Sequence, residues 1–319
     1  MEKRTFSSEV KEELVRVYPE KKCCVLAELA AIARKEGTLT IGEDGSIGFY
    51  MVLGQASLAR KVYRMLRDLH TGESVPELKR NTSRRRRSTY TIRLKPCEET
   101  TSLLQLMGVL SSGKRILQGI KKELIRKKCC QMAYLRGAFL GGGSVSSPDR
   151  DYHMEITASS EAYARDLAAL LNRFAGMQGK TSRRKQSYLV YLKGSDQIAD
   201  FMTIIGAHNH LLVFENTRIY RSMRNQVNRI VNLETANLGK TSFASARQVE
   251  QISLIRDKIG LDALEPSLAQ IARLRLENPD INLKELGEIM KPPLGKSGVN
   301  HRLRKISDIA ENLKKNPSF

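Results

Sequence analysis

Two short basic clusters stand at matching places in the sequence, and their chemistry suits contact with phosphate. One consists of Arg84, Arg85, Arg86 and Arg87, and the other of Arg183, Arg184 and Lys185. Guanidinium and ammonium groups hold a nucleic-acid backbone without reading its sequence. After each cluster, apolar residues alternate with period two, as in Tyr90, Ile92 and Leu94, which predicts a strand. We therefore expect both clusters in hairpins, where they either contact phosphates or are merely solvated.

A second group of polar and basic residues lies near the C-terminal end, around "KSGVNHRLRKISDIAENL" (296–313). Arginine and asparagine side chains can form paired hydrogen bonds with guanine and adenine edges, so such residues can read a DNA sequence. The candidates are Asn282, Leu283, Lys284, Glu285, Leu286, Lys296, Ser297, Asn300, His301, Arg302, Arg304 and Lys305. Val299, Leu303 and Ile306 recur at helical spacing, which predicts a stripe that packs inward and leaves polar residues outside.

Three predicted helices must position these candidates. The first opens at Pro266, a residue favoured in a first helical turn, and Asn282 is placed to cap the second. Pro292 and Pro293 break the chain after the second helix, and Ser297 is placed to cap the third. A helix, a break and a basic amphipathic helix form a helix-turn-helix pattern, whose last helix enters the major groove. The break is longer than in the tightest examples, and a plain three-helix bundle is the alternative.

The cysteines give little support for a metal site. Four of the five form the adjacent pairs Cys23-Cys24 and Cys129-Cys130, with no C-x-x-C spacing and no histidine pair nearby. Zinc sites usually show such spacing. We therefore expect these cysteines to pack as small apolar side chains, and we expect no metal.

Other segments that resemble ligand sites lack an essential residue. His208 and His210 have no evident third metal ligand, and we expect a turn there, after a helix that ends near Gly206. The segments "LGKTS" (238–242) and "LGKSG" (294–298) end like a phosphate-binding loop but lack its first glycine. We therefore expect no cofactor and no small-molecule substrate.

The N-terminal two thirds of the chain contain a duplication. Residues 21–38 read "KKCCVLAELAAIARKEGT" and residues 127–144 read "KKCCQMAYLRGAFLGGGS", and the two align without a gap. Downstream, helical stripes in 59–66 and 164–171 correspond, and each precedes one of the basic clusters. Each half reads as a helix, two strands, a helix, two strands and a further helix. This order predicts a pseudo-twofold α+β domain.

Small residues recur on the helix that opens each half. Ala27 and Ala31 in the first copy match Ala133 and Gly137 in the second, and Gly141 follows one turn later. Such residues let two helices approach backbone to backbone. We expect these helices to pack against each other across the pseudo-twofold axis. A plain core helix with accidental small residues is the alternative.

Paired helices of this kind, each followed by two strands, a helix and two strands, resemble the LAGLIDADG homing endonuclease fold. The complete chain resembles the WhiA family of bacterial sporulation and cell-division regulators. The most specific segments are 127–144, "RNQVNRIVNLETANLGK" (224–240) and 296–313. The resemblance implies a duplicated domain whose two sheets form a saddle over DNA, followed by a helix-turn-helix domain. It also implies a role in cell division, chromosome segregation and sporulation.

The resemblance raises the question of DNA cleavage. In the endonucleases, the last acid of each motif helps to hold the divalent cations that activate water. Glu36 stands at this place in the first copy, but Gly142 stands there in the second. One carboxylate is a poor cage for Mg²⁺, and Glu36 alone reads as an ordinary surface residue. These vestigial metal positions predict a scaffold that does not cut DNA.

The charge of the chain agrees with a nucleic-acid partner. Lysine and arginine number 54 against 34 aspartate and glutamate, which gives a net charge of +20 and suits a polyanion. An anionic membrane surface is the rival partner. However, no apolar run approaches the roughly 20 residues of a membrane-spanning helix, and the N-terminus lacks an apolar signal core. We expect a cytoplasmic, nucleoid-associated protein that binds double-stranded DNA and no membrane.

These observations predict an α+β domain over residues 1–211 (halves about 1–110 and 111–211), a helical connector over 212–260 and an all-α helix-turn-helix domain over 261–319. The predicted function is that of a sequence-specific DNA-binding transcriptional regulator without enzymatic activity, with transcription machinery or another regulator as a further partner. Two alternatives stay open, an active LAGLIDADG endonuclease and a protein-binding scaffold for transcription or division machinery. Cleavage distinguishes the first alternative, and salt-dependent duplex binding distinguishes the second.

Overall fold

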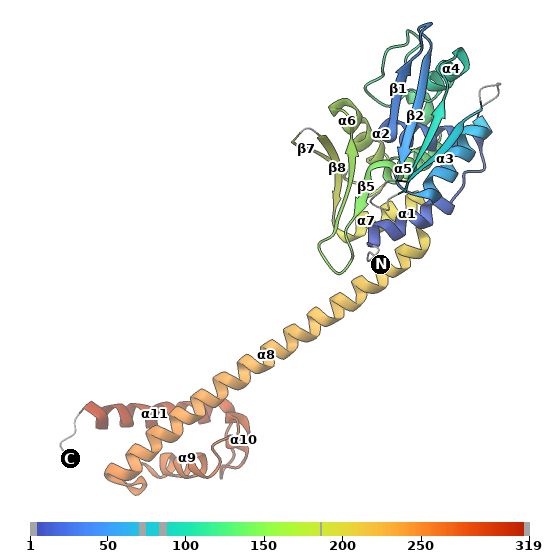
Figure 1. Cartoon of the computed structure of the whole chain (residues 1–319). Helices are drawn as coiled ribbons and strands as arrows, with labels where there is room; N and C mark the ends of the chain where they lie inside the picture. Colours follow the sequence, from blue (N-terminus) through green and yellow to red (C-terminus); the bar gives the residue numbers. More distant parts are fainter. Residues whose placement is uncertain (1–4, 70–74, 83–87, 186, 316–319) are drawn as a thin grey trace. The chain divides into compact units, whose positions relative to one another are not determined.

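The computed structural model describes residues 5–69, 75–82, 88–185 and 187–315, which form two compact units, residues 1–222 and 223–319 (Figure 1). The division falls inside one long helix, α8 (His208–Ile259). Near the end of α8, Ile252 and Ile255 are fully buried in the core of the second unit. The segment 212–260, predicted as a helical connector, therefore belongs partly to each unit and does not form a third compact unit.

The first unit consists of α1 (Phe6–Arg16), two copies of one arrangement and the first turns of α8. The first copy contains α2 (Lys22–Glu36), β1 (Gly37–Ile41), β2 (Ile47–Leu53), α3 (Ala56–Leu69), β3 (Glu77–Thr82), β4 (Ser88–Leu94) and α4 (Glu98–Leu106). The second contains α5 (Lys128–Gly142), β5 (Gly143–Val145), β6 (His153–Ala158), α6 (Glu161–Leu171), β7 (Lys180–Arg184), β8 (Ser187–Lys193) and α7 (Ser195–Ile205). The predicted order of elements and the α+β fold class are confirmed. The charged run before α5 forms only a short 3₁₀ helix, η1 (Lys122–Ile125).

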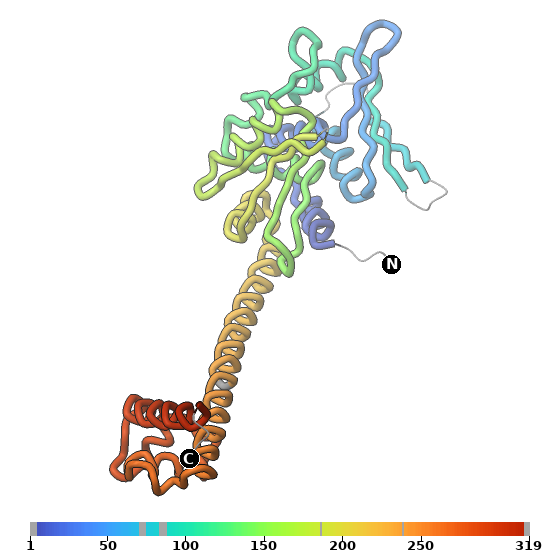
Figure 2. The backbone as a smooth tube through the Cα atoms, turned by 90° about the vertical axis from the view of Figure 1, so that its left-hand side faces the viewer, coloured from blue at the N-terminus to red at the C-terminus, as the bar shows by residue number. Residues whose placement is uncertain are grey.

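Each copy contains a four-stranded antiparallel sheet with the same strand order, β1-β2-β4-β3 and β5-β6-β8-β7. The predicted alternation is confirmed, because Ile92 and Leu94 on β4 and Val190 and Leu192 on β8 are buried. The residues between them lie on the opposite face of each sheet. Figure 2 shows the two sheets as separate groups of strands, and Figure 1 shows α2 and α5 between these groups.

The helices α2 and α5 form the centre of the first unit, and small residues set their spacing. Ala27, Ala31 and Ala133 are at most 1% exposed. A Cβ atom added to Gly137 would lie 2.2 Å from the backbone oxygen of Glu28. No side chain fits in so short a distance, so the two backbones pack directly against each other. The prediction that small residues mediate the contact between the halves is confirmed.

The second unit is helical. It contains the last turns of α8, the 3₁₀ helix η2 (Leu261–Ala263), α9 (Pro266–Glu277), α10 (Leu283–Glu288) and α11 (Lys296–Lys315). Its core includes Ile252, Ile255, Leu268, Ile271, Leu286, Met290, Val299, Leu303 and Ile306. Pro266 occupies the first turn of α9, as predicted. Helices α10 and α11 with the segment 289–295 between them form the helix-turn-helix arrangement.

Candidate nucleic-acid interface

Helix α11 presents most of the candidate base-reading residues to solvent. Val299, Leu303 and Ile306 are at most 4% exposed and hold the helix on the core, as predicted. On the remaining surface, Lys296, Ser297, His301, Arg304 and Lys305 are exposed, and Asn300 is half-buried. A helix with a polar face clear of its own core can enter a major groove. Whether these side chains contact bases stays a prediction.

Two candidates, Leu286 and Arg302, have contacts inside the unit that the sequence did not indicate, and Ser297 lacks the capping role predicted for it. Leu286 is fully buried in the core, so its inclusion among surface contacts was wrong. Ser297 does not cap α11, because the helix already begins at Lys296. Arg302 is half-buried, and its Nη1 donates to the backbone oxygen of Ser267 at 3.4 Å, which draws the side chain toward α9.

Asn282 and Glu285 form a capping box at the start of α10, which confirms the predicted cap. The Asn282 side-chain oxygen accepts hydrogen bonds from the backbone N–H groups of Lys284 (2.9 Å) and Glu285 (3.1 Å). In return, Glu285 Oε2 accepts from the backbone N–H of Asn282 at 3.0 Å. The pair satisfies backbone donors that a helix start leaves without partners. The first role of both residues is therefore to hold α10 in place.

A pocket of about 460 Å³ lies between α8 and the two helices of the helix-turn-helix. Residues of α8 that the sequence did not indicate line it beside four candidates, Asn282, Leu283, Lys284 and Lys296. The α8 residues are Lys240, Thr241, Ala244, Ser245 and Gln248. Their recurrence at helical spacing was a signal that could have found them. Lys240 adds a positive charge to this side of the unit and extends the candidate surface onto α8.

Buried Arg275 fixes the loop that leads into α10. Its side chain is 1% exposed, and its Nη1 donates to the backbone oxygen of Ile281 at 2.7 Å. Ser245 of α8 bonds to the backbone oxygen of Pro279 in the same loop. These bonds join α8, α9 and the start of α10, so the pocket has a defined shape.

The hairpins of the first unit carry the second set of candidates. Arg183 and Arg184 are exposed at the end of β7, and the Arg183 guanidinium lies 5.9 Å from the centre of the Tyr188 ring. Lys185 is also exposed and has a positive φ of 55°, as in a tight turn. The matching cluster Arg84–Arg87 lies outside the described residues. The expected phosphate contacts of both clusters stay predictions.

The open face of each sheet also carries basic residues, which the sequence reasoning missed. On the first sheet, Lys79 pairs with Thr91 and Arg93 with Glu77, so these side chains lie opposite the buried Ile92. On the second, Lys180 and Lys193 lie opposite the buried Val190 and Leu192. Lys79, Arg93, Lys180 and Lys193 are all exposed. The period-two alternation could have placed them on the open faces, and on the second sheet Arg184 shares that face with Lys180 and Lys193.

The two vestigial metal positions lie at the C-terminal ends of α2 and α5. Burial raises the pKa of Glu36, and the nearby Lys35 and Lys11 oppose that effect. At Gly142, an added Cβ atom would lie 2.5 Å from Thr157 Oγ1 and 3.4 Å from Lys35 Cγ. The place that would need a second carboxylate is thus filled by a threonine and a lysine side chain. The surroundings of Glu36 are basic, which disfavours a divalent cation.

The four paired cysteines meet at the opposite ends of α2 and α5. The Sγ atoms of Cys23, Cys24, Cys129 and Cys130 all lie within 4.8 Å of one another. Cys24 and Cys130 are buried, as predicted, but Cys23 and Cys129 are half-buried. These thiols come from both halves, whereas the usual C-x-x-C spacing describes ligands within one segment. The duplication placed equivalent cysteines on two helices expected to pack together, and that signal could have revealed the cluster.

His208 and His210 belong to the first turn of α8 and not to the turn predicted there. Gly206 ends α7 with a φ of 88°, and α8 begins two residues later. His210 Nδ1 lies 2.5 Å from Glu13 Oε2, which also accepts the backbone N–H of His210. This histidine therefore belongs to a helix cap. The segment 238–242, considered above as a phosphate loop, lies within α8.

Three successive segments of the chain match the domains of one family. Residues 22–110 match the WhiA N-terminal LAGLIDADG-like domain, and residues 131–224 match the WhiA LAGLIDADG-like domain. Residues 227–310 match the WhiA C-terminal HTH domain. The matches follow the order of the two copies and the helix-turn-helix described above.

Proteins called probable cell division protein WhiA are similar along almost the whole chain. The one from Heliobacterium modesticaldum is 46% identical over 307 residues, which cover 96% of each chain. The one from Desulfitobacterium hafniense strain Y51 is 48% identical over 310 residues, or 97% of this chain and 96% of the relative. The crystal structure of full-length DUF199/WhiA from Thermatoga maritima is similar with a TM-score of 0.58 and 27% identity, covering 97% of this chain and 99% of that one. None of the described helices is both long and apolar enough to cross a bilayer.

Proposed function

Because this chain belongs to the WhiA family, we propose that it is a sequence-specific DNA-binding transcriptional regulator. The observation that carries the proposal is the exposed face of α11, where His301, Arg304 and Lys305 stand clear of the core. These side chains offer donors that can bond to base edges and phosphates. The basic pocket with Lys240, beside α10 and the start of α11, supplies further charge for a DNA backbone.

The biological setting of this proposal comes from the relatives, which carry the name of a cell division protein. We propose a role in cell division and chromosome segregation, and in sporulation where the organism forms spores. A regulator of this kind acts on the nucleoid in the cytoplasm. Its protein partners are the transcription machinery or another regulator.

We further propose that the first unit positions DNA without cutting it. Support comes from the foot of the helix pair, where Glu36 is accompanied by Lys11 and Lys35 and where Gly142 offers no side chain. Two-metal cleavage needs carboxylates from both sides of the scissile phosphate. The exposed Lys79, Arg93, Lys180 and Lys193 on the open sheet faces suit phosphate contacts instead.

The proposal is tested in two steps. Binding sites of the full chain are first mapped across the chromosome, which supplies a cognate duplex. Anisotropy titrations of that duplex and of a scrambled one then follow at several salt concentrations. We expect tighter binding of the cognate duplex, by about 10³-fold or more, and a steep loss of affinity with salt. Equal affinity for both duplexes would contradict sequence recognition, and no salt-dependent binding at all would favour the protein-binding scaffold.

A further inference from the structure

The four-cysteine cluster joins the two halves of the first unit at one point. Cys23 and Cys24 lie in the first turn of α2, and Cys129 and Cys130 lie in the first turn of α5. Their four Sγ atoms are within 4.8 Å of one another. Among the residues that the structure describes, this is the one group of three or more histidine, cysteine or acidic side chains with its ligand atoms gathered so closely.

The size and composition of the cluster fit a single metal ion. In a structural zinc site, four thiolates surround the ion as a tetrahedron with bonds of about 2.3 Å, so that their sulfurs are about 3.8 Å apart. The observed spread of the four Sγ atoms allows that geometry with small rotations of the side chains. An iron–sulfur cluster places several metal atoms between its cysteines and therefore needs a wider set of ligands. No nitrogen or oxygen ligand has to be added, because the four thiols already fill the coordination sphere of zinc.

We propose that Cys23, Cys24, Cys129 and Cys130 bind one Zn²⁺ ion, which fastens the N-terminal ends of α2 and α5 to each other. On binding, the four thiols release their protons to solvent, and four sulfur–zinc bonds form. No oxidant or reductant takes part. The site is closed, so the ion has a structural and not a catalytic role. It lies at the other end of the helix pair from Glu36 and Gly142, the vestigial metal positions.

The surroundings suit the charge of the loaded site. Zinc with four thiolates carries two negative charges, and each pair of cysteines sits at the positive end of a helix. Lys21 and Lys22 precede the first pair, and Lys127 and Lys128 precede the second; all four are exposed. Their charges oppose that of the site from both halves. Cysteines that packed only as apolar side chains would carry no negative charge for these four lysines to oppose.

Zinc content gives the first test. The full chain, without a polyhistidine tag, is purified under reducing conditions, and its zinc is measured by elemental mass spectrometry after dialysis. We expect about one zinc ion per chain. After replacement of zinc by Co²⁺, we expect the intense visible absorption of tetrahedral cobalt and the sulfur-to-cobalt charge-transfer band of a tetrathiolate. The proposal would be overturned if the purified chain contained no metal and also failed to give this cobalt spectrum. It would also be overturned if the four cysteines were found joined in disulfides.

Two variants locate the metal. The half-buried pair is changed in Cys23→Ser/Cys129→Ser, which should abolish stoichiometric zinc and the tetrathiolate spectrum. The control Cys97→Ser changes the fifth cysteine, which caps α4 away from the cluster, and should keep both. Zinc retained by the double variant would overturn the proposal. Should the double variant fail to fold, the wild-type zinc content and cobalt spectrum still decide the matter.

Thermal unfolding tests whether the bound ion stabilises the first unit. All ten tyrosines lie in residues 1–222 and the chain has no tryptophan, so tyrosine fluorescence reports the first unit alone. A zinc chelator should lower the thermal midpoint of this transition in the wild type and in Cys97→Ser, because an ion bound only to the folded state stabilises it. The double variant should not respond. A midpoint that the chelator leaves unchanged in all three proteins would contradict a structural ion.

Discussion

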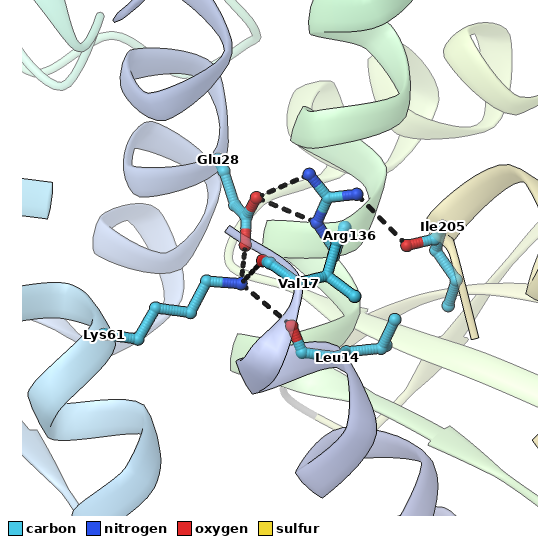
Figure 3. A network of polar contacts seen from close by, with 6 residues as sticks. All are labelled: Leu14, Val17, Glu28, Lys61, Arg136 and Ile205. Atoms are coloured by element: carbon cyan, nitrogen blue, oxygen red, sulfur yellow. Dashed lines mark hydrogen bonds and ion pairs between the residues drawn. The ribbon is translucent and has the colours of Figure 1, made fainter. Parts of the chain in front are cut away.

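The carboxylate of Glu28 on α2 lies 2.8 Å from Nη2 of Arg136 on α5, so a buried ion pair crosses the boundary between the two halves (Figure 3). The other oxygen of Glu28 lies 2.5 Å from Nζ of Lys61 on α3. Lys61 also donates to the backbone oxygen of Leu14 at 2.9 Å, and Arg136 donates to that of Ile205 at 3.2 Å. The network around this one fully buried carboxylate thus joins five helices, α1, α2, α3, α5 and α7.

Removal of the Glu28 charge should destabilise the first unit strongly. In Glu28→Gln the cations of Lys61 and Arg136 would remain buried beside each other without an anion, which typically costs about 3–5 kcal/mol. Urea unfolding followed by tyrosine fluorescence measures the change. The control is Glu161→Gln, which breaks the exposed pair with Arg165 and should cost less than about 0.5 kcal/mol. Equal costs for the two variants would show that the buried network contributes little.

The close contact of α2 and α5 makes a second prediction about stability. In Gly137→Ala the new methyl group would lie 2.2 Å from the Glu28 backbone oxygen, so the helices must separate. We expect a loss of about 1–3 kcal/mol in the free energy of unfolding, as for other overpacked cores. Gly54→Ala is the control, because an added Cβ there meets no atom within 4 Å. Equal free energies of unfolding for the two variants in urea would contradict a tight contact between α2 and α5 at Gly137.

The sequence predicted what depends on local pattern. The alternation around Ile92 and Val190 and the stripe of Val299, Leu303 and Ile306 identify buried faces, because burial follows the period of a strand or a helix. The aligned duplication then predicted the α2–α5 pair. Buried Glu28 and Arg136 escaped prediction, because an ion pair between distant segments leaves no periodic trace in either one.

Contacts between segments also explain what was missed in the candidate sites. The cysteine cluster needs thiols from both halves, and spacing rules apply to ligands within one segment. Leu286 stands in a polar stretch, yet its side chain is fully buried in the core of the second unit. Lys240 joins the pocket only because the end of α8 folds against α10 and α11. Such neighbours follow from the tertiary fold and not from local sequence.

Stability should depend on pH through Glu13. Burial tends to raise the pKa of this carboxyl group, but hydrogen bonds from His210 and from two backbone N–H groups outweigh burial and lower the pKa. Because its pKa is lowered in the folded protein, the ionised Glu13 carboxylate stabilises the fold. This contribution is complete above the ordinary glutamate pKa of about 4.3, and it is lost as the pH falls through the pKa that Glu13 has in the folded protein. Glu13→Gln should therefore cost about 1 kcal/mol at neutral pH, the usual worth of a helix cap.

To isolate the contribution of Glu13, the free energy of unfolding of Glu13→Gln is subtracted from that of the wild type at each pH. Urea unfolding by tyrosine fluorescence should show this difference shrinking toward zero below about pH 4. Glu20→Gln, at an exposed residue of the same unit, should show no such trend. A difference that stays constant with pH would assign the effect to packing and not to the charge of Glu13.

DNA cleavage should be absent. With Mg²⁺ or Mn²⁺, the purified protein should leave supercoiled and linear DNA intact, because Glu36 has no carboxylate opposite it at Gly142 and lies beside Lys11 and Lys35. Gel analysis of cognate and plasmid DNA over long incubations checks this. Metal-dependent cutting that disappears in Glu36→Gln would overturn the prediction and restore the nuclease alternative.

The last prediction divides DNA recognition between the units. Arg304→Ala on α11 should cost about 1–3 kcal/mol on a cognate duplex and little on random DNA, if the side chain reads a base. Changing Arg183 and Arg184 together should weaken binding to all sequences alike and flatten the salt slope by up to about two units. The same result is expected for Arg84 and Arg85.

Titrations of cognate and scrambled duplexes at several salt concentrations separate these effects. Arg256→Ala serves as the control for Arg304, because it removes an exposed arginine of the same unit that is not among the candidates and lies about 24 Å along α8 from Lys240. It should change neither affinity nor salt slope. If Arg304→Ala weakened both duplexes equally while the loss of Arg183 and Arg184 erased discrimination, the assignment would be reversed. The open sheet faces would then read the sequence, and the helix-turn-helix would only hold the backbone.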